Sequence, residues 1–202
     1  MTVIDPYFDP AVNDLRNLLG ARTSDELRLL EPQAVFANEI ELADRSIRRT
    51  NNLRELCAIH AQLFRGVYDW AGHIRTVDIR KPDDDARFFL PVAYIDRAAG
   101  FVFGELLEAK SLKGLSVTDF IDRLAYFYDQ LNYIHPFREG NGRAQRVFWQ
   151  RVARDAGYFV DWAKVVGAEN DAACRAAMTL GDHRPLGEMF LKIVDRTSPL
   201  TN

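Results

Sequence analysis

A proline separates two amphipathic patterns in the middle of the chain, and this break most limits the possible fold. Before it, apolar side chains follow the four-three spacing of one buried helix face, at Phe120, Leu124, Phe127, Leu131 and Ile134. Pro136 ends this helix near His135, because a residue before proline disfavours the α conformation. A second helical pattern begins after residue 140, with Ala144, Val147, Phe148 and Val152 on one side. The sequence therefore predicts two helices joined by a tight Glu-Gly-Asn-Gly loop.

This loop and the start of the second helix combine features that suit an anion. Free N–H groups and the positive end of the helix dipole attract negative charge, and Gly140 and Gly142 let a phosphate approach the main chain. Arg143 and Arg146 form an i, i+3 pair in the first turn that can point toward one anion. Each feature taken singly is an ordinary turn or solvated helix face. Together, in a chain of formal net charge -3, they indicate a polyphosphate site rather than a nucleic-acid surface.

The same stretch resembles the signature of the Fic family (Fic/Doc superfamily), His-x-Phe-x-Asp/Glu-Gly-Asn-Gly-Arg-x-x-Arg. Every fixed position is filled, by His135, Phe137, Glu139, Gly140, Asn141, Gly142, Arg143 and Arg146. Doc-like kinases carry Lys where this chain has Gly142, which argues against the inverted nucleotide pose implied for them. The resemblance implies a mainly α fold, a Fic-type helical bundle with one β-hairpin flap. It also implies transfer of AMP from ATP to a hydroxyl side chain of a target protein.

The resemblance further implies a chemical role for the first residues of the motif. His135 would take the proton from a Ser, Thr or Tyr hydroxyl of the target, which suits an imidazole because it titrates near neutral pH. Glu139 would hold Mg²⁺ bridging the α- and β-phosphates, since a hard cation prefers oxygen ligands. Phe137 is expected to anchor the loop in the core.

The remaining motif residues are expected to bind the nucleotide. Asn141 and the N–H groups around Gly140 and Gly142 would form an anion hole for the α-phosphate, where charge develops as pyrophosphate leaves. Arg143 and Arg146 would hold the β- and γ-phosphates. ATP and Mg²⁺ are therefore the expected ligands.

Length and composition indicate an ordinary soluble protein with one core. The chain has 202 residues, 48% hydrophobic and 27% charged, and we expect a single Fic domain with an N-terminal helical segment at 1–50 and a core at about 51–196. No apolar run approaches the roughly 20 residues of a membrane helix and no basic, apolar leader is visible, so we expect a cytoplasmic protein without a membrane partner. A pI near 5.8 argues against direct nucleic-acid binding, and isolated Cys57 and Cys174 are expected to be buried free thiols.

Helix signals recur along the rest of the chain. His60 is expected to be structural, and residues 158–162 to form an extended link whose aromatic side chains pack in the core rather than line an adenine site. The expected helices are a short one from Asn13 to Leu19, one capped by Ser24 and ending at Leu30, one from Pro32 to about Arg49, one from Asn51 or Asn52 to Phe64, one from Ala93 to Lys110, one capped by Ser116 or Thr118, one closed by Gly157, one from Glu169 to Leu180 and one from Pro185 to Arg196.

Residues 73–90 change to an extended pattern that predicts a β-hairpin. Its strand-forming residues flank an acidic turn at 82–85. The hairpin alone would be read as an edge element that adds stability. The family resemblance implies instead a flap that aligns a target segment by main-chain pairing, with Val77, Asp78, Ile79 and Arg80 as the target-binding residues.

The chain lacks an inhibitory motif that many Fic proteins carry, a helix with Ser/Thr-x-x-x-Glu-Gly/Asn. No Ser or Thr here has Glu four residues on. The resemblance then implies a stand-alone toxin held inactive by a separate small antitoxin, which would place the Glu of its own Ser/Thr-x-x-x-Glu helix on Arg146. By analogy alone, DNA gyrase and topoisomerase IV are the first expected targets.

Two other functions stay open from the sequence. One is a related Fic phosphotransferase that moves another group, such as UMP, phosphate or phosphocholine, because nothing in the loop reads the base. The other is a non-catalytic Fic module that binds peptides along the flap. The presence of both His135 and Glu139 disfavours this second alternative, since a binding module needs neither a base nor a metal ligand.

Overall fold

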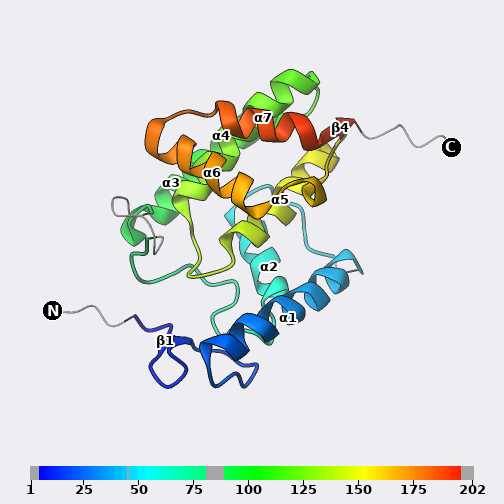
Figure 1. The fold of residues 1–202 in the computed structure, drawn as a ribbon. Helices are drawn as coiled ribbons and strands as arrows, with labels where there is room; N and C mark the ends of the chain where they lie inside the picture. Colours follow the sequence, from blue (N-terminus) through cyan, green and yellow to red (C-terminus); the bar gives the residue numbers. More distant parts are fainter. Residues whose placement is uncertain (1–4, 45, 81–88, 197–202) are drawn as a thin grey trace.

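The computed structural model describes residues 5–44, 46–80 and 89–196, and this part of the chain is mainly helical (Figure 1). Its α-helices are α1 Ser24–Asp44, α2 Leu53–Leu63, α3 Ile95–Glu108, α4 Val117–Ile134, α5 Asn141–Asp155, α6 Gly167–Leu180 and α7 Arg184–Ile193. Short 3-10 turns lie at η1 Val92–Tyr94, η2 Lys110–Leu112 and η3 Trp162–Lys164. The predicted mainly α fold is confirmed.

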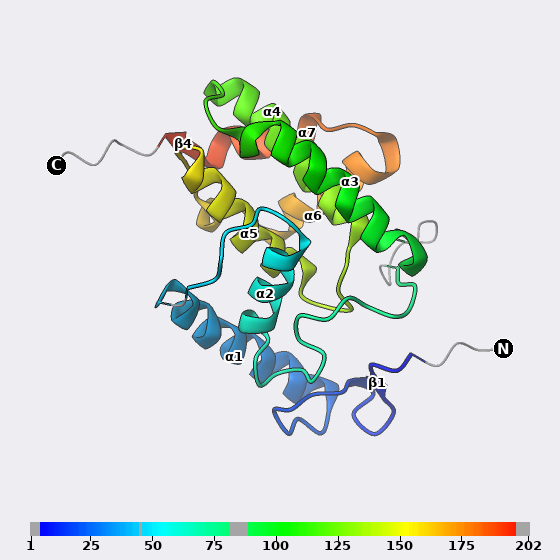
Figure 2. The same cartoon turned by 180° about the vertical axis from the view of Figure 1, so that it is seen from behind.

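Helices α4 and α5 form the centre of the bundle. Helix α2 packs against α5 and α1 packs against α2, while α3, α6 and α7 pack around α4 (Figures 1 and 2). Large aromatic side chains fill the interior between these layers, among them Phe120, Phe127, Phe148 and Trp149. The start of α5, which carries the predicted anion site, therefore lies next to the layer made by α1 and α2.

Helix α1 is one continuous helix, where two helices divided before Pro32 were expected. A proline inside a helix removes one hydrogen bond, here to the carbonyl of Arg28. The two halves share one buried face, and within it Asn38 donates from Nδ2 to the carbonyl oxygens of Leu63 and Arg65 at 3.0 and 2.9 Å. Tertiary packing on the end of α2 therefore outweighs the local break.

The ends of α1 also differ from expectation. The hydroxyl of Thr23 accepts a hydrogen bond from the N–H of Glu26 at 3.1 Å, so Thr23 caps the helix in place of Ser24. Ser24 instead donates to the carboxylate of Asp14 at 2.6 Å. The helix ends at Asp44, five residues before the expected end.

A two-stranded pair replaces the short helix expected at 13–19. Strand β1, Phe8–Asp9, pairs antiparallel with β2, Asp14–Leu15. The turn is closed by Asp9, whose side chain accepts from the N–H of Ala11 at 2.9 Å and whose carbonyl accepts from Asn13 at 2.9 Å. A seven-residue window is too short to hold a helix without tertiary support, because helix nucleation is costly.

A second antiparallel pair joins the end of the chain to α5. Strand β3, Tyr158–Val160, confirms the extended link expected there and pairs with β4, Val194–Arg196. Helix α7 consequently ends at Ile193 and not at Arg196. The strand partner is 36 residues away at its central pair of Phe159 and Asp195, so no local pattern could indicate it.

Several predicted helix signals are confirmed. The side chain of Asn52 accepts from the N–H of Arg54 at 3.0 Å at the start of α2, and Ser116 caps α4 by accepting from Asp119 at 3.2 Å. Gly157 follows α5 with a φ of 87°, as a C-terminal glycine should. Helix α3 is shorter than expected, because Lys110, Ser111 and Leu112 turn into the left-handed region after it.

The predicted hairpin at 73–90 lies only partly within the described residues, because residues 81–88, including the acidic turn, fall outside them. Arg80 forms an isolated β-bridge, and the N–H of Phe89 donates to the carbonyl of Ile79 at 3.1 Å. Residues 73–79 carry no regular strand.

Two further expectations concern the thiols and the membrane. Cys174 is buried as expected, whereas Cys57 is only partly buried, and both are free thiols. No described helix is both long and apolar enough to cross a bilayer.

Candidate active site

His135 sits at the junction between α4 and the motif loop, in a left-handed conformation with φ 47°. Its Nδ1 lies 3.0 Å from the carbonyl oxygen of Asn132, so Nδ1 carries the proton and Nε2 the lone pair. The imidazole stacks on the ring of Phe89, with centroids 3.6 Å apart and planes at 11°. One hydrogen bond and one ring contact therefore fix the orientation of the predicted base.

Asn141 closes the motif loop with its side chain. Its Oδ1 accepts from the N–H of Phe137 at 2.8 Å, and its Nδ2 donates to the carbonyl of Phe137 at 2.8 Å. Both polar atoms of this buried side chain are thus used to shape the loop. Asn141 can therefore contribute only its backbone N–H to the predicted anion hole.

The two glycines of the loop serve different purposes. A Cβ on Gly140, which has φ 79°, would lie 2.1 Å from the ring of Phe64, so only glycine fits there. A Cβ on Gly142 would meet nothing within 4 Å. Glycine at 140 is required by packing against α2, while Gly142 leaves open space at the mouth of α5.

A buried histidine supports the loop from below. His60 is stacked between Phe64 and Phe137, with centroids at 4.5 and 3.9 Å. Its Nδ1 accepts from the N–H of Gly72 at 2.8 Å, so Nε2 is the protonated nitrogen and donates to the carbonyl of Glu139 at 3.0 Å. Burial lowers the pKa of His60 to about 4, and the imidazole stays neutral. The structural role expected for His60 is thereby given a definite contact.

The N-terminal end of α5, here called its mouth, presents both a carboxylate and main-chain N–H groups that have no partner within the helix. The first N–H to bond within the helix is that of Ala144, to the carbonyl of Gly140 at 3.0 Å, so the preceding N–H groups have no partner within the helix. The side chain of Glu139 is 47% exposed, and its Oε1 accepts from the N–H of Gly140 at 2.9 Å. The N–H groups at the start of α5, which carry partial positive charge, therefore lie next to the accessible carboxylate of Glu139.

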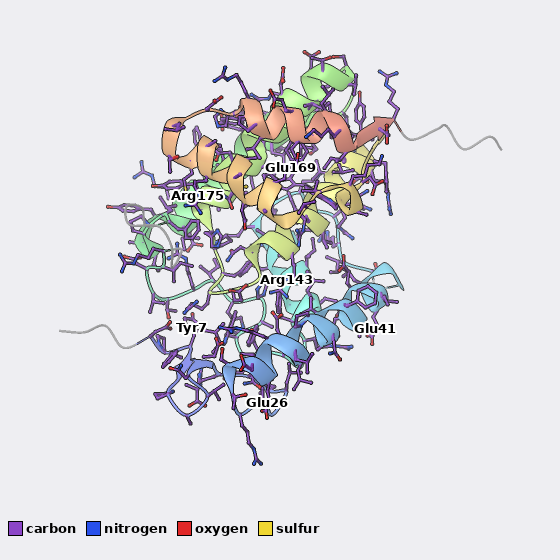
Figure 3. All side chains as sticks on the ribbon, viewed as in Figure 1. Tyr7, Glu26, Glu41, Arg143, Glu169 and Arg175 are labelled. Atoms are coloured by element: carbon purple, nitrogen blue, oxygen red, sulfur yellow. The ribbon has the colours of Figure 1, made fainter. Side chains whose placement is uncertain are left out.

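Arg143 is held from several sides. Its Nη1 donates to Oε2 of Glu31 at 2.8 Å, its Nη2 lies 2.7 Å from the other oxygen of Glu31, and the guanidinium sits 4.8 Å over the ring of Phe64. Glu139 lies 3.4 Å from Nη2. Burial alone would lower the pKa of Arg143, but the hydrogen bond and charge of Glu31 outweigh it and raise the pKa. Figure 3 shows Arg143 at the start of α5, facing α1.

Arg146 lies one turn further along α5 and differs from Arg143 in its surroundings. Both arginines line one cavity of about 500 Å³ between α1 and α5, so both reach the same side of the helix. Among the side chains that the structure describes, no carboxylate lies within ion-pair distance of Arg146. The cavity wall also includes Arg154, which adds to the local positive charge.

Comparison with known proteins decides the family. The profile of the Fic/DOC family matches residues 50–153. The chain belongs to the Fic/DOC family. It is therefore an enzyme of the nucleotidyltransferase class, as its named relatives are.

Two relatives and one solved structure illustrate the match. "Probable protein adenylyltransferase Fic" of Salmonella typhimurium is 36% identical over 192 residues, covering 94% of this chain and 92% of the relative. Protein adenylyltransferase VbhT of Bartonella schoenbuchensis is 38% identical over 161 residues, covering 80% of this chain and 33% of that protein. The crystal structure of BepC from Bartonella tribocorum with bound AMPPNP superposes with a TM-score of 0.88 at 25% identity, covering 95% and 97% of the two chains.

Sequence reasoning missed Arg75, which ties the motif loop of this Fic/DOC chain to the predicted flap. The side chain is fully buried, with Nε donating to the carbonyl of His135 and Nη1 to that of Val77, both at 2.8 Å, and Nη2 donating to that of Leu90. Burial lowers the pKa of this guanidinium, and the charge of Asp78 opposes the change. The available signal was the position of this arginine directly after Ile74 in a segment of strand-forming residues.

The N-terminal segment also reaches the Fic/DOC motif. Asp5 accepts from Nε of Arg138 at 2.9 Å, and the hydroxyl of Tyr7 accepts from the N–H of Thr76 at 3.0 Å. Asp5 and Tyr7 lie before the region that the family profile matches. The segment therefore contacts both the motif loop and the base of the flap, which its sequence did not indicate.

The predicted flap residues are connected to His135 through Arg75 and Phe89. The carbonyls of Val77 and Ile79 are bonded within the flap base, and Oδ1 of Asp78 accepts from the N–H of Val92 at 2.8 Å. Arg80 is exposed at the edge of the described residues. Their role in binding a target stays a prediction.

The aromatic residues after α5 lie in three different settings, and Phe159, expected in the core, is exposed instead. Tyr158 is buried, stacks on Phe120 at 4.2 Å and donates to the carbonyl of Leu115 at 2.7 Å. Trp162 lies on the wall of the cavity that Arg146 lines. Tyr158 therefore belongs to the core.

Proposed function

We propose that this chain transfers AMP from ATP to a Ser, Thr or Tyr hydroxyl of a target protein in the cytoplasm. What most supports this is the placement of His135, oriented through Nδ1, immediately before a helix mouth that carries two arginines on one side. A base next to a polyphosphate site suits attack by an alcohol on phosphorus. The relatives named protein adenylyltransferase give the same activity.

In this reaction the hydroxyl proton moves to Nε2 of His135 while the hydroxyl oxygen attacks the α-phosphorus. The bond between the α-phosphorus and the oxygen bridging to the β-phosphate breaks, and pyrophosphate leaves with the bonding electrons. The N–H groups of Asn141, Gly142 and Arg143 lie where a helix start stabilises charge on the α-phosphate. Arg143 and Arg146 compensate the charge on the leaving group.

The carboxylate of Glu139 suits Mg²⁺. The described residues contain no cluster of three or more metal-ligating side chains, and Mg²⁺ commonly uses one or two carboxylates, water and substrate phosphates. Glu139 is exposed at the mouth of α5, with one oxygen bonded to the N–H of Gly140, and it would hold the ion there. When bound, the ion neutralises phosphate charge.

The flap is proposed to align the target. Its base is joined to the catalytic residue through Phe89, which stacks on His135, and through Arg75, which bonds the carbonyls of both His135 and Val77. A target strand paired with residues 77–80 would carry its hydroxyl to a fixed place relative to the imidazole. Such pairing places few demands on the target's sequence.

We further propose that the protein is a toxin controlled by a separate antitoxin. The antitoxin would place the Glu of a Ser/Thr-x-x-x-Glu helix on Arg146, which has no carboxylate partner among the described side chains and lines an open cavity. A glutamate there would occupy the place of the γ-phosphate. DNA gyrase and topoisomerase IV are the first targets to test, by analogy with stand-alone Fic toxins.

The test of the activity is labelling of a bacterial lysate with α-labelled ATP and Mg²⁺. We expect label on a lysate protein with the natural chain and none with His135→Ala. Equal labelling by both proteins would contradict a role for His135, and no labelling by either would contradict AMP transfer. Mass spectrometry of the labelled protein identifies the group added, and a UMP, phosphate or phosphocholine adduct would favour the related phosphotransferase.

A further inference from the structure

Glu31 lies on α1, outside the residues that the family profile matches, yet it contacts a residue of the motif. The residue is 8% exposed, and its carboxylate meets the guanidinium of Arg143 end-on, with Oε2 accepting from Nη1 at 2.8 Å and Oε1 2.7 Å from Nη2. The two residues are separated by 112 positions in the sequence. A two-point contact of this kind fixes both the place and the plane of an arginine.

The end-on geometry leaves part of the guanidinium for another anion. A guanidinium has five N–H groups. Nη1 donates one to Oε2 of Glu31, and Nη2, which faces Oε1 of Glu31, donates one to Oε1 of Glu139 at 3.4 Å, at the mouth of α5. Nε–H and the second N–H of Nη1 remain for another anion. The edge of Arg143 that faces this mouth is therefore compatible with a phosphate while Glu31 stays in place.

Burial argues that Glu31 stays in place when a phosphate arrives. Among the described residues, Arg143 is the cation that accompanies this carboxylate, and Oε1 of Glu31 accepts no hydrogen bond there, so the charge of Arg143 is its only compensation among them. Displacement by a phosphate would leave a buried carboxylate without its counter-charge, which is strongly unfavourable. The opposite function, a carboxylate that competes with ATP for Arg143, would require that displacement.

We propose that Glu31 is a positioning residue, which holds Arg143 for the β- and γ-phosphates of ATP and does not itself touch the nucleotide. The inference rests on the proposed function for the identity of the nucleotide. The proposal gives the two motif arginines different roles. Arg143 supplies a fixed geometry with its charge partly balanced, and Arg146 supplies charge without a described carboxylate within ion-pair distance.

The test uses calorimetry to compare the affinities of the 202-residue chain for MgATP and for AMP. Glu31→Gln keeps the size of the side chain and removes its charge, and we expect MgATP binding to weaken about tenfold. AMP has no β- or γ-phosphate, so its affinity should stay the same. Glu41→Gln is the matched control and should change neither affinity. Glu41 lies on α1, the helix of Glu31, and forms an exposed ion pair at 2.6 Å with Arg65, which follows α2.

A double-mutant cycle shows whether Glu31 acts through Arg143. Once Arg143 is replaced by Ala, Glu31→Gln should cause no further loss of MgATP affinity. Unchanged or tighter MgATP binding by Glu31→Gln would overturn the proposal in favour of competition or no role. An equal loss of MgATP and AMP binding would also overturn it, since this would indicate general damage to the site. Absence of AMP transfer, with these binding differences intact, would count against the proposed function alone.

Discussion

The guanidinium of Arg75 donates from Nε to the carbonyl oxygen of His135 at 2.8 Å, across 60 positions of sequence. The same side chain donates to the carbonyls of Val77 and Leu90, one in each limb of the flap base. A cation is favourable at the end of α4, where the last carbonyls carry the negative end of the helix dipole. One buried side chain therefore ties the backbone of His135 to both limbs of the flap base.

Replacement of Arg75 by Ala should destabilise the protein by about 3–5 kcal/mol, because several buried carbonyls lose their donor together. The free energy of unfolding in urea measures this. Arg97→Ala, at an exposed position on α3, is the control and should stay within about 0.5 kcal/mol of the natural chain. Equal stabilities of the two variants would show that the bonds of Arg75 contribute little.

Gly140→Ala and Gly142→Ala should differ sharply in stability although they are two residues apart. A Cβ at 140 would lie 2.1 Å from Phe64 on a backbone with φ 79°, which we expect to cost about 3 kcal/mol or more. A Cβ at 142 meets open space in the first turn of α5, so stability should change by less than about 1 kcal/mol. Thermal melting of the two variants measures the difference, and similar melting temperatures would contradict the packing.

His60 should make stability fall as the solution becomes acidic. Burial lowers the folded-state pKa to about 4, whereas the unfolded imidazole titrates near its ordinary value of about 6.5. The unfolded chain then binds a proton that the folded chain does not, so stability is full above about pH 6.5 and declines toward pH 4. By pH 5 the loss is roughly 2 kcal/mol relative to pH 7.

Urea unfolding at pH 7 and pH 5 tests this for the natural chain and for His60→Gln. Glutamine can still donate to the carbonyl of Glu139 but does not titrate, so the variant should lose about 2 kcal/mol less than the natural chain between the two pH values. His73→Gln, at an exposed position, should keep the natural dependence. A dependence unchanged in His60→Gln would exclude His60 as its source.

Phe89→Ala should slow AMP transfer and leave ATP binding unchanged. The ring of Phe89 stacks on His135 at 3.6 Å, and its loss frees the imidazole to leave its orientation. We expect the transfer rate to fall about tenfold, since catalysis depends on such alignment. Phe101→Ala, which removes an exposed ring on α3, should transfer at the natural rate. Transfer at the natural rate by Phe89→Ala would show that the stacking is not needed.

Much of the helical framework could be predicted because helix positions and ends depend on residues close together in the sequence. The spacing of apolar residues through Ile134, the proline at 136 and the glycine at 157 gave α4 and α5 with nearly the observed ends. The caps Asn52 and Ser116 were each one of two predicted candidates, because capping depends on residues only two or three positions away. Elements that depend on distant partners, such as the β3–β4 pair and the continuous α1, were missed.

The sequence by itself determined the motif, its order and the helix mouth that it builds, because the residues from 135 to 146 act over a few turns of one chain. Only the tertiary structure decided three contacts of the site. The side chain of Asn141 bonds the backbone of the motif loop, the ring of Phe64 excludes a side chain at position 140, and Glu31 binds Arg143. Those contacts join residues far apart in sequence. Burial, which makes them strong and selective, exists only once the helices have packed.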